Sequence, residues 1–142
     1  MRMLIILVFL LSLNLHSENY VFDSRGNSEQ KILNFKNNKK YIHISTVGWW
    51  TDSLGNYGIE KCYGKTEILN DNVNLDIVCE LIDQNKEVQK VSRKRNSLVG
   101  AGIGINTYLE TSEKYNFLLG KECTYAVTFL NKDFFYKQKC KQ

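Results

Sequence analysis

The chain has 142 residues, with 19 lysines and arginines against 15 acidic residues and a formal net charge of +4. This length fits one domain that is large enough to bury a hydrophobic core. The charge is only mildly basic and scattered, apart from a denser run at residues 90–95, so we expect no nucleic-acid partner.

Residues 1–17 have the pattern of a secretory signal peptide. Arg2 precedes an apolar stretch, Leu4 to Leu15, which is shorter than the about 20 residues that a spanning helix needs. Cleavage is expected near Ser17, with an uncleaved anchor as the alternative. The sequence therefore predicts an exported protein, periplasmic or secreted, in which residues 18–142 form one domain without a further membrane-spanning segment.

The first part of this domain has the patterns of strands and turns. Residues 19–35 are expected to supply one or two edge strands. Residues 39–50 alternate between two faces, so the neighbours Trp49 and Trp50 are expected on opposite sides of a strand. Residues 52–58, which contain two glycines, predict a turn.

Two cysteine pairs share a spacing of seventeen residues, Cys62 to Cys79 and Cys123 to Cys140. A hairpin turn at residues 70–71 places the first two directly opposite each other, and a turn centred on residues 131–132 does the same for the second two. Opposed residues of an antiparallel pair have Cα atoms as close as about 4.5 Å, which a disulfide accepts. Because exported chains retain such bonds, we predict the disulfides Cys62–Cys79 and Cys123–Cys140.

Other uses of the four cysteines are less consistent with the sequence. Four cysteines allow two other pairings, and a metal site is a further alternative. Zinc-binding cysteines usually come in close pairs, and redox-active ones in C-x-x-C, and the sequence contains neither pattern. We therefore expect no metal and no cofactor.

The remaining segments extend the strand pattern. Residues 87–96 form a basic strand, and residues 101–110 form another with Gly102 and Gly104 on one face, which suits close packing. A helical turn is expected within residues 111–120. Seven or eight short strands joined by turns predict an all-β antiparallel meander that closes into a barrel, with a β-sandwich as the alternative.

One segment resembles a known group of proteins. Residues 101–120, "AGIGINTYLETSEKYNFLLG", resemble the allene oxide cyclase and dirigent-like barrels, in which a glycine-containing strand precedes a Gly-Thr-Gly-Lys-Tyr turn and a further glycine. The shared residues are Thr111, Lys114, Tyr115 and Gly120, whereas Ser112 and Glu113 depart from the pattern. The resemblance implies an eight-stranded barrel with a central cavity, and it carries over no catalytic residue.

Aromatic and basic side chains supply the candidates for a binding site. Tryptophan and tyrosine line many ligand pockets, and an inward-facing arginine of the basic strand would need a carboxylate such as Glu80. The candidate ligand-binding residues are Trp49, Trp50, Tyr57, Tyr63, Tyr108, Arg93 and Arg95. We assign no catalytic residue, because His43 is the one histidine after the leader and no G-x-S-x-G motif is present.

Three functions follow as hypotheses. The first is non-enzymatic binding of a small apolar or amphipathic ligand, or of a protein partner, in the cell envelope. The second is a cyclase or isomerase, implied by the resemblance alone, and the third is a secreted inhibitor or interaction module. A closed apolar cavity favours a small ligand, convergent polar groups in a cavity favour an enzyme, and a filled core with an exposed apolar patch favours an interaction module.

Overall fold

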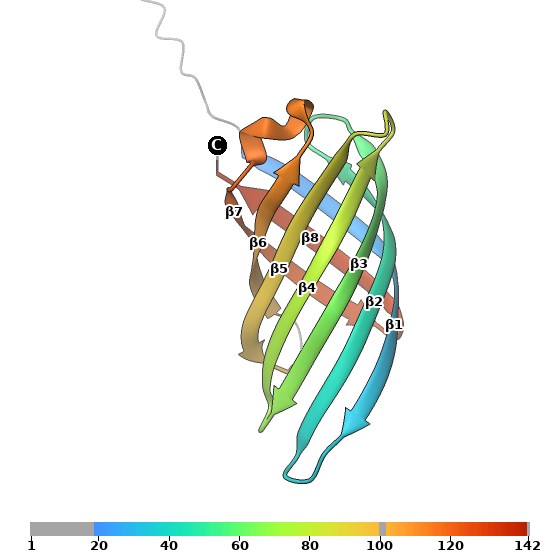
Figure 1. Ribbon diagram of the computed structural model, residues 1–142, viewed down its shortest axis with the longest axis vertical. Coiled ribbons are helices and arrows are strands. Elements are labelled where there is room, and N and C mark those ends of the chain that lie inside the picture. The colour runs from blue at the N-terminus through green and yellow to red at the C-terminus, as the bar shows by residue number, and fades with distance from the viewer. Residues whose placement is uncertain (1–18, 100–101, 142) are drawn as a thin grey trace, which may run out of the picture.

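The computed structural model describes residues 19–99 and 102–141, so the predicted signal peptide lies outside the described residues. Eight antiparallel strands follow one another in chain order, and the last pairs with the first to close a barrel (Figure 1). This confirms the predicted barrel and excludes the sandwich. The strands are β1 (Tyr20–Asn34), β2 (Lys39–Asp52), β3 (Tyr57–Leu69), β4 (Asn72–Asp83), β5 (Val88–Leu98), β6 (Gly102–Thr111), β7 (Glu122–Leu130) and β8 (Asp133–Cys140).

The closing of the barrel gives the first strand a partner on both sides. The sequence suggested one or two edge strands over residues 19–35, whereas the structure has the single strand β1, paired with β2 on one side and with β8 on the other. The pairing with β8 reaches Asn27, so the β1–β2 hairpin extends beyond the rest of the barrel (Figure 1). A closed barrel has no edge strand over its paired length, and this removes a site of uncontrolled strand pairing.

The two cysteine hairpins have the predicted register. Cys62 lies opposite Cys79 and Cys123 lies on the strand paired with that of Cys140, and both disulfides are formed with Cα separations of 4.0 and 4.4 Å. Asn70, Asp71 and Asn131 take positive φ values of 48°, 64° and 58° at the turns. Asn and Asp tolerate this conformation, which the tight hairpin turns require.

A short 3₁₀ helix, η1 (Glu113–Leu118), covers one end of the barrel. Its Tyr115 and Leu118 are fully buried. Asp83, at the end of β4, accepts hydrogen bonds from Lys114 Nζ at 2.7 Å and from Tyr115 OH at 2.9 Å. The predicted helical turn is therefore present, and we call this end of the barrel the closed end and the opposite one the open end.

Alternate side chains of every strand point into the barrel. The largest of the buried side chains are aromatic, and they include Phe22, Trp50, Tyr108 and Tyr136. The described residues include no helix with the length and apolar character needed to cross a bilayer.

Candidate functional site

An ion pair lies inside the barrel between β3 and β5. Arg93 Nη2 is 2.7 Å from Glu60 Oε2, and both side chains are almost completely buried. Ser24 Oγ donates to the other carboxylate oxygen at 2.7 Å, and Arg93 Nε donates to Asn106 Oδ1 at 3.2 Å. Burial lowers the pKa of Arg93, but Glu60 opposite it more than compensates, so the pKa lies above its ordinary value.

The carboxylate that pairs with the interior arginine differs from the one the sequence suggested. Glu80 is exposed on the outer face of β4, where it lies across from Lys90. Glu60 reaches Arg93 instead, across the barrel interior, because both occupy inward-facing positions.

Aromatic rings surround the ion pair. The guanidinium carbon of Arg93 lies 3.9 Å from the ring centre of Tyr136, which stacks on Tyr125 with centres 4.9 Å apart. Gln138 accepts a hydrogen bond from Tyr136 OH and donates to Tyr108 OH. Burial raises the pKa of Tyr108 to about 12 and that of Tyr136 well above its ordinary value, so both phenols stay neutral at physiological pH.

The interior contains little free space. A cavity of about 30 Å³ remains between Arg93, Tyr125 and Phe134, which is the liquid volume of about one water molecule. The central cavity implied by the family resemblance is therefore filled by the protein's own side chains. Around this cavity the described side chains form a packed polar network that leaves room for about one water molecule.

Two further polar groups near the open end lack partners among the described residues. Arg95 Nε and Tyr125 OH are buried without a hydrogen-bond partner. Arg95 packs against Gly102 and the Tyr125 ring packs against Gly104, where a Cβ atom would collide with them. The two glycines thus leave the space that these large side chains occupy.

Glu60, Cys62 and Cys79 are the one group of three potential metal ligands found among the described residues. Both sulfurs are joined in a disulfide. They offer no thiolate, so this group does not make a metal site.

A second hollow, wider than the interior cavity, lies on the outside of the barrel. This outer groove has a volume of about 730 Å³ and crosses β6, β7, β8, β1 and β2. Its floor is a row of residues in register at inward-facing positions of the strands, namely Gly102, Val127, Tyr136, Ser24 and Trp50. Its walls are the two neighbouring rows, whose side chains point outward.

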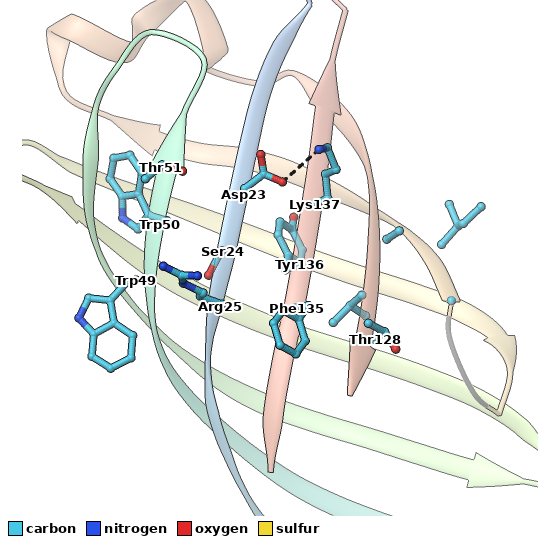
Figure 2. A pocket seen from close by; sticks show the side chains of 14 residues that line it. Asp23, Ser24, Arg25, Trp49, Trp50, Thr51, Thr128, Phe135, Tyr136 and Lys137 are labelled. Atoms are coloured by element: carbon cyan, nitrogen blue, oxygen red, sulfur yellow. Dashed lines mark ion pairs between the residues drawn. The ribbon is translucent and has the colours of Figure 1, made fainter. Parts of the chain in front are cut away.

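Figure 2 shows the two walls of the outer groove. One wall consists of Trp49, Arg25, Phe135 and Thr128, and the other of Thr51, Asp23, Lys137, Ala126 and Ile103. Trp49 is 60% exposed, Phe135 49% and Ile103 68%. An exposed ion pair between Asp23 and Lys137, 3.4 Å apart, is the polar element of the second wall.

The candidate residues from the sequence divide between the two sides of the barrel wall. Trp50, Tyr108, Arg93 and Arg95 are buried inside, whereas Trp49, Tyr57 and Tyr63 are about 60% exposed outside. The structure therefore does not bring the seven residues into one site. Trp49 belongs to the outer groove and Tyr57 extends one wall through its pairing with Thr51, while Tyr63 lies farther along β3.

Phe135, Arg25 and Ile103 of the outer groove were absent from the sequence prediction. Alternation along each strand assigns all three to the outer face. Arg25 lies beside Trp49 through the β1–β2 pairing. Phe135 and Ile103 come near these two residues through the β1–β8 pairing that closes the barrel, and no local pattern encodes this pairing.

Comparison with known proteins supports the fold and leaves the activity open. The structure matches a crystal structure described as an enzyme from Penicillium herquei, with a TM-score of 0.62 and 13% sequence identity over 84% of this chain and 91% of that chain. No protein-family model and no curated protein matches the sequence. The chain thus shares a barrel fold with an enzyme of unspecified activity.

Proposed function

We propose that this protein is an exported, non-catalytic interaction module that binds a protein partner through the outer groove. One observation carries the proposal: the barrel interior is packed, whereas its outer wall presents an apolar groove. A filled core with an exposed apolar patch is the combination expected of an interaction module. The predicted leader and the two disulfides support action in the cell envelope or outside the cell.

The chemistry of the outer groove favours a protein over a small molecule. Small-molecule sites bury most of their ligand's surface, whereas this groove is open to solvent along its length. Trp, Tyr and Arg are the side chains that most often dominate binding energy in protein interfaces. Trp49 and Arg25 stand side by side in one wall, with Tyr57 at the end of the other wall.

The expected contact is made by side chains. All eight strands are paired within the closed barrel, so the groove offers no free strand edge for a partner strand to join. A partner is therefore expected to insert apolar side chains between Trp49 and Ile103, while its polar groups meet Arg25 and the Asp23–Lys137 pair.

A photo-crosslinking experiment tests this proposal in the native host. A photoreactive phenylalanine derivative at Thr128, in the groove wall, should capture a protein of defined mass, whereas the same probe at Tyr63 should not. Tyr63 is the matched control because it has the same exposure as Trp49 and lies on the outer face beyond the groove.

Affinity measurements with the purified partner then test the groove itself. Trp49→Ala is expected to weaken binding by at least about tenfold, and Tyr63→Ala to leave it unchanged. Equal capture from both probe positions, or equal affinity of both variants, would contradict the proposal.

A second candidate function is a cyclase or isomerase that acts inside the barrel. The convergence of Arg93, Glu60, Tyr108 and Tyr136 supports this candidate, together with the match in fold to an enzyme. It requires the interior to open, because the remaining cavity is about 30 Å³. Native mass spectrometry of the exported protein separates the two candidates, since a retained small molecule would favour the second.

A further inference from the structure

The open end of the barrel carries exposed apolar side chains on all four of its hairpin tips. In this meander β1, β3, β5 and β7 end, and β2, β4, β6 and β8 begin, at the end opposite η1 (Figure 1). Each tip bears at least one large apolar side chain that is 47% to 68% exposed, namely Leu33, Phe35, Leu69, Leu98, Val99 and Leu130.

The same end is basic. Residues 29–40, which form most of the protruding β1–β2 hairpin, contain four lysines and one glutamate, and Lys132 lies in the β7–β8 turn. The closed end is nearly neutral, because its connections at residues 52–56, 83–87 and 112–121 contain four acidic residues and three lysines. The β3–β4 and β7–β8 hairpins also hold Asp71 and Asp133 at their tips, so the net positive charge beside the apolar tips comes from the β1–β2 hairpin.

The spatial arrangement of these side chains suits a lipid surface. They sit on separate hairpins that reach different distances from the barrel (Figure 1), and Asn or Asp residues occupy the β1–β2, β3–β4 and β7–β8 turns. A fluid interface accepts isolated apolar tips without shape complementarity, whereas a protein partner needs a continuous complementary face. Lysines near an anionic surface are attracted to it electrostatically.

We propose that the open end docks on a membrane surface that contains anionic lipids. The Leu, Phe and Val side chains of the tips enter the interfacial region, and the lysines of the β1–β2 hairpin contact the headgroups. The outer groove lies on the side wall of the barrel and stays accessible in this orientation. The proposal is independent of the groove's function.

Vesicle flotation with the protein exported through its own leader tests the docking. Binding is expected to vesicles of phosphatidylcholine with 30% phosphatidylglycerol and to weaken strongly on pure phosphatidylcholine or in about 0.5 M salt, where the Debye length is short. The double variant Leu33→Ser/Phe35→Ser should bind at least about tenfold more weakly, because it removes two inserted side chains.

The matched control is the double variant Leu54→Ser/Leu119→Ser, which removes two comparably exposed leucines at the closed end. It should bind vesicles like the unmodified protein, and so should Trp49→Ala in the outer groove. Circular dichroism of each variant verifies that the barrel is folded.

Three outcomes would overturn the proposal: no binding to anionic vesicles, equal loss in the two double variants, or binding that depends on salt but not on Leu33 and Phe35. Because Trp49→Ala tests only the groove, failure of the membrane proposal and failure of the interaction-module proposal are distinguishable.

Discussion

The Arg93–Glu60 ion pair is the centre of a group of hydrogen-bonded polar side chains inside the barrel. The two residues lie on strands that are separated by β4, so their contact crosses the interior. Ser24 and Asn106 supply additional hydrogen bonds to the two charged groups. A buried pair of this kind adds little net stability, but the loss of one partner leaves an uncompensated charge.

We therefore predict that Arg93→Met lowers the free energy of unfolding by about 3–5 kcal/mol. Urea denaturation of the oxidised protein measures this change. The double variant Glu60→Gln/Arg93→Met should be more stable than Arg93→Met alone, because the amide carries no charge. A single variant as stable as the unmodified protein would show that the pair is not the buried unit described above.

Two glycines at inward positions of β6 make room for large side chains of neighbouring strands. Gly102 and Gly104 lie beneath Arg95 and Tyr125, and a Cβ atom at either position would overlap these side chains. The sequence already indicated close packing at the two glycines. It did not identify the packing partners, because they come from β5 and β7.

The 3₁₀ helix η1 is attached to the end of β4 through one carboxylate, that of Asp83. Asp83 joins the end of β4 to Lys114 and Tyr115 of η1, and its second oxygen accepts backbone hydrogen bonds from Asn85 and Glu87. Burial raises the pKa of Asp83, but the hydrogen bonds from Lys114, the backbone and Tyr115 outweigh it, so the pKa lies below the ordinary 3.8.

Because the pKa of Asp83 is lowered, we predict that the closed end loses stability in acid. The stabilisation is fully present above the unfolded-state pKa of about 3.8 and is lost as the pH falls through the lower folded-state pKa. Asp83→Asn should therefore reduce stability at neutral pH and flatten its decline between about pH 5 and pH 2. Urea unfolding at a series of pH values measures both effects.

The control for this prediction is Asp76→Asn, the same change at an exposed position on the outer face of β4. Its stability should follow the pH dependence of the unmodified protein. A curve for Asp83→Asn that parallels the unmodified protein through the acid range would contradict the role assigned to Asp83.

At the scale of the whole molecule, the pairing of β1 with β8 closes the barrel and makes the outer groove continuous. The β1–β8 pairing over residues 20–27 joins the first strand to the last and places Phe135 beside Arg25, which the β1–β2 pairing holds beside Trp49. Without this pairing the outer groove would be divided between two separate edges of an open sheet.

We predict that amide hydrogen exchange reveals this closure. Amides of β8 and of residues 20–27 in β1 should exchange as slowly as those of β3 and β4, because both sides of these strands are paired. Amides at residues 30–34, beyond the pairing with β8, should exchange faster. Fast exchange throughout β1 and β8, measured by mass spectrometry, would indicate an open sheet.

The sequence by itself determined the elements that depend on neighbours along the chain. Period-2 alternation, Asn and Asp at the turns and the equal cysteine spacing predicted the strands, both hairpin registers and both disulfides. These features are local, because a hairpin turn sets the pairing of the strands that flank it.

Only the tertiary structure decided which residues meet across the barrel and around its wall. The sequence suggested a carboxylate such as Glu80 for an interior arginine and listed seven candidate ligand-binding residues together. The structure pairs Arg93 with Glu60 and divides the candidate residues between the barrel interior and its outer face, with Trp49 and Trp50 on opposite sides as alternation predicted. The physical reason is that closure and interior packing depend on contacts between strands that are distant along the chain, which no local pattern specifies.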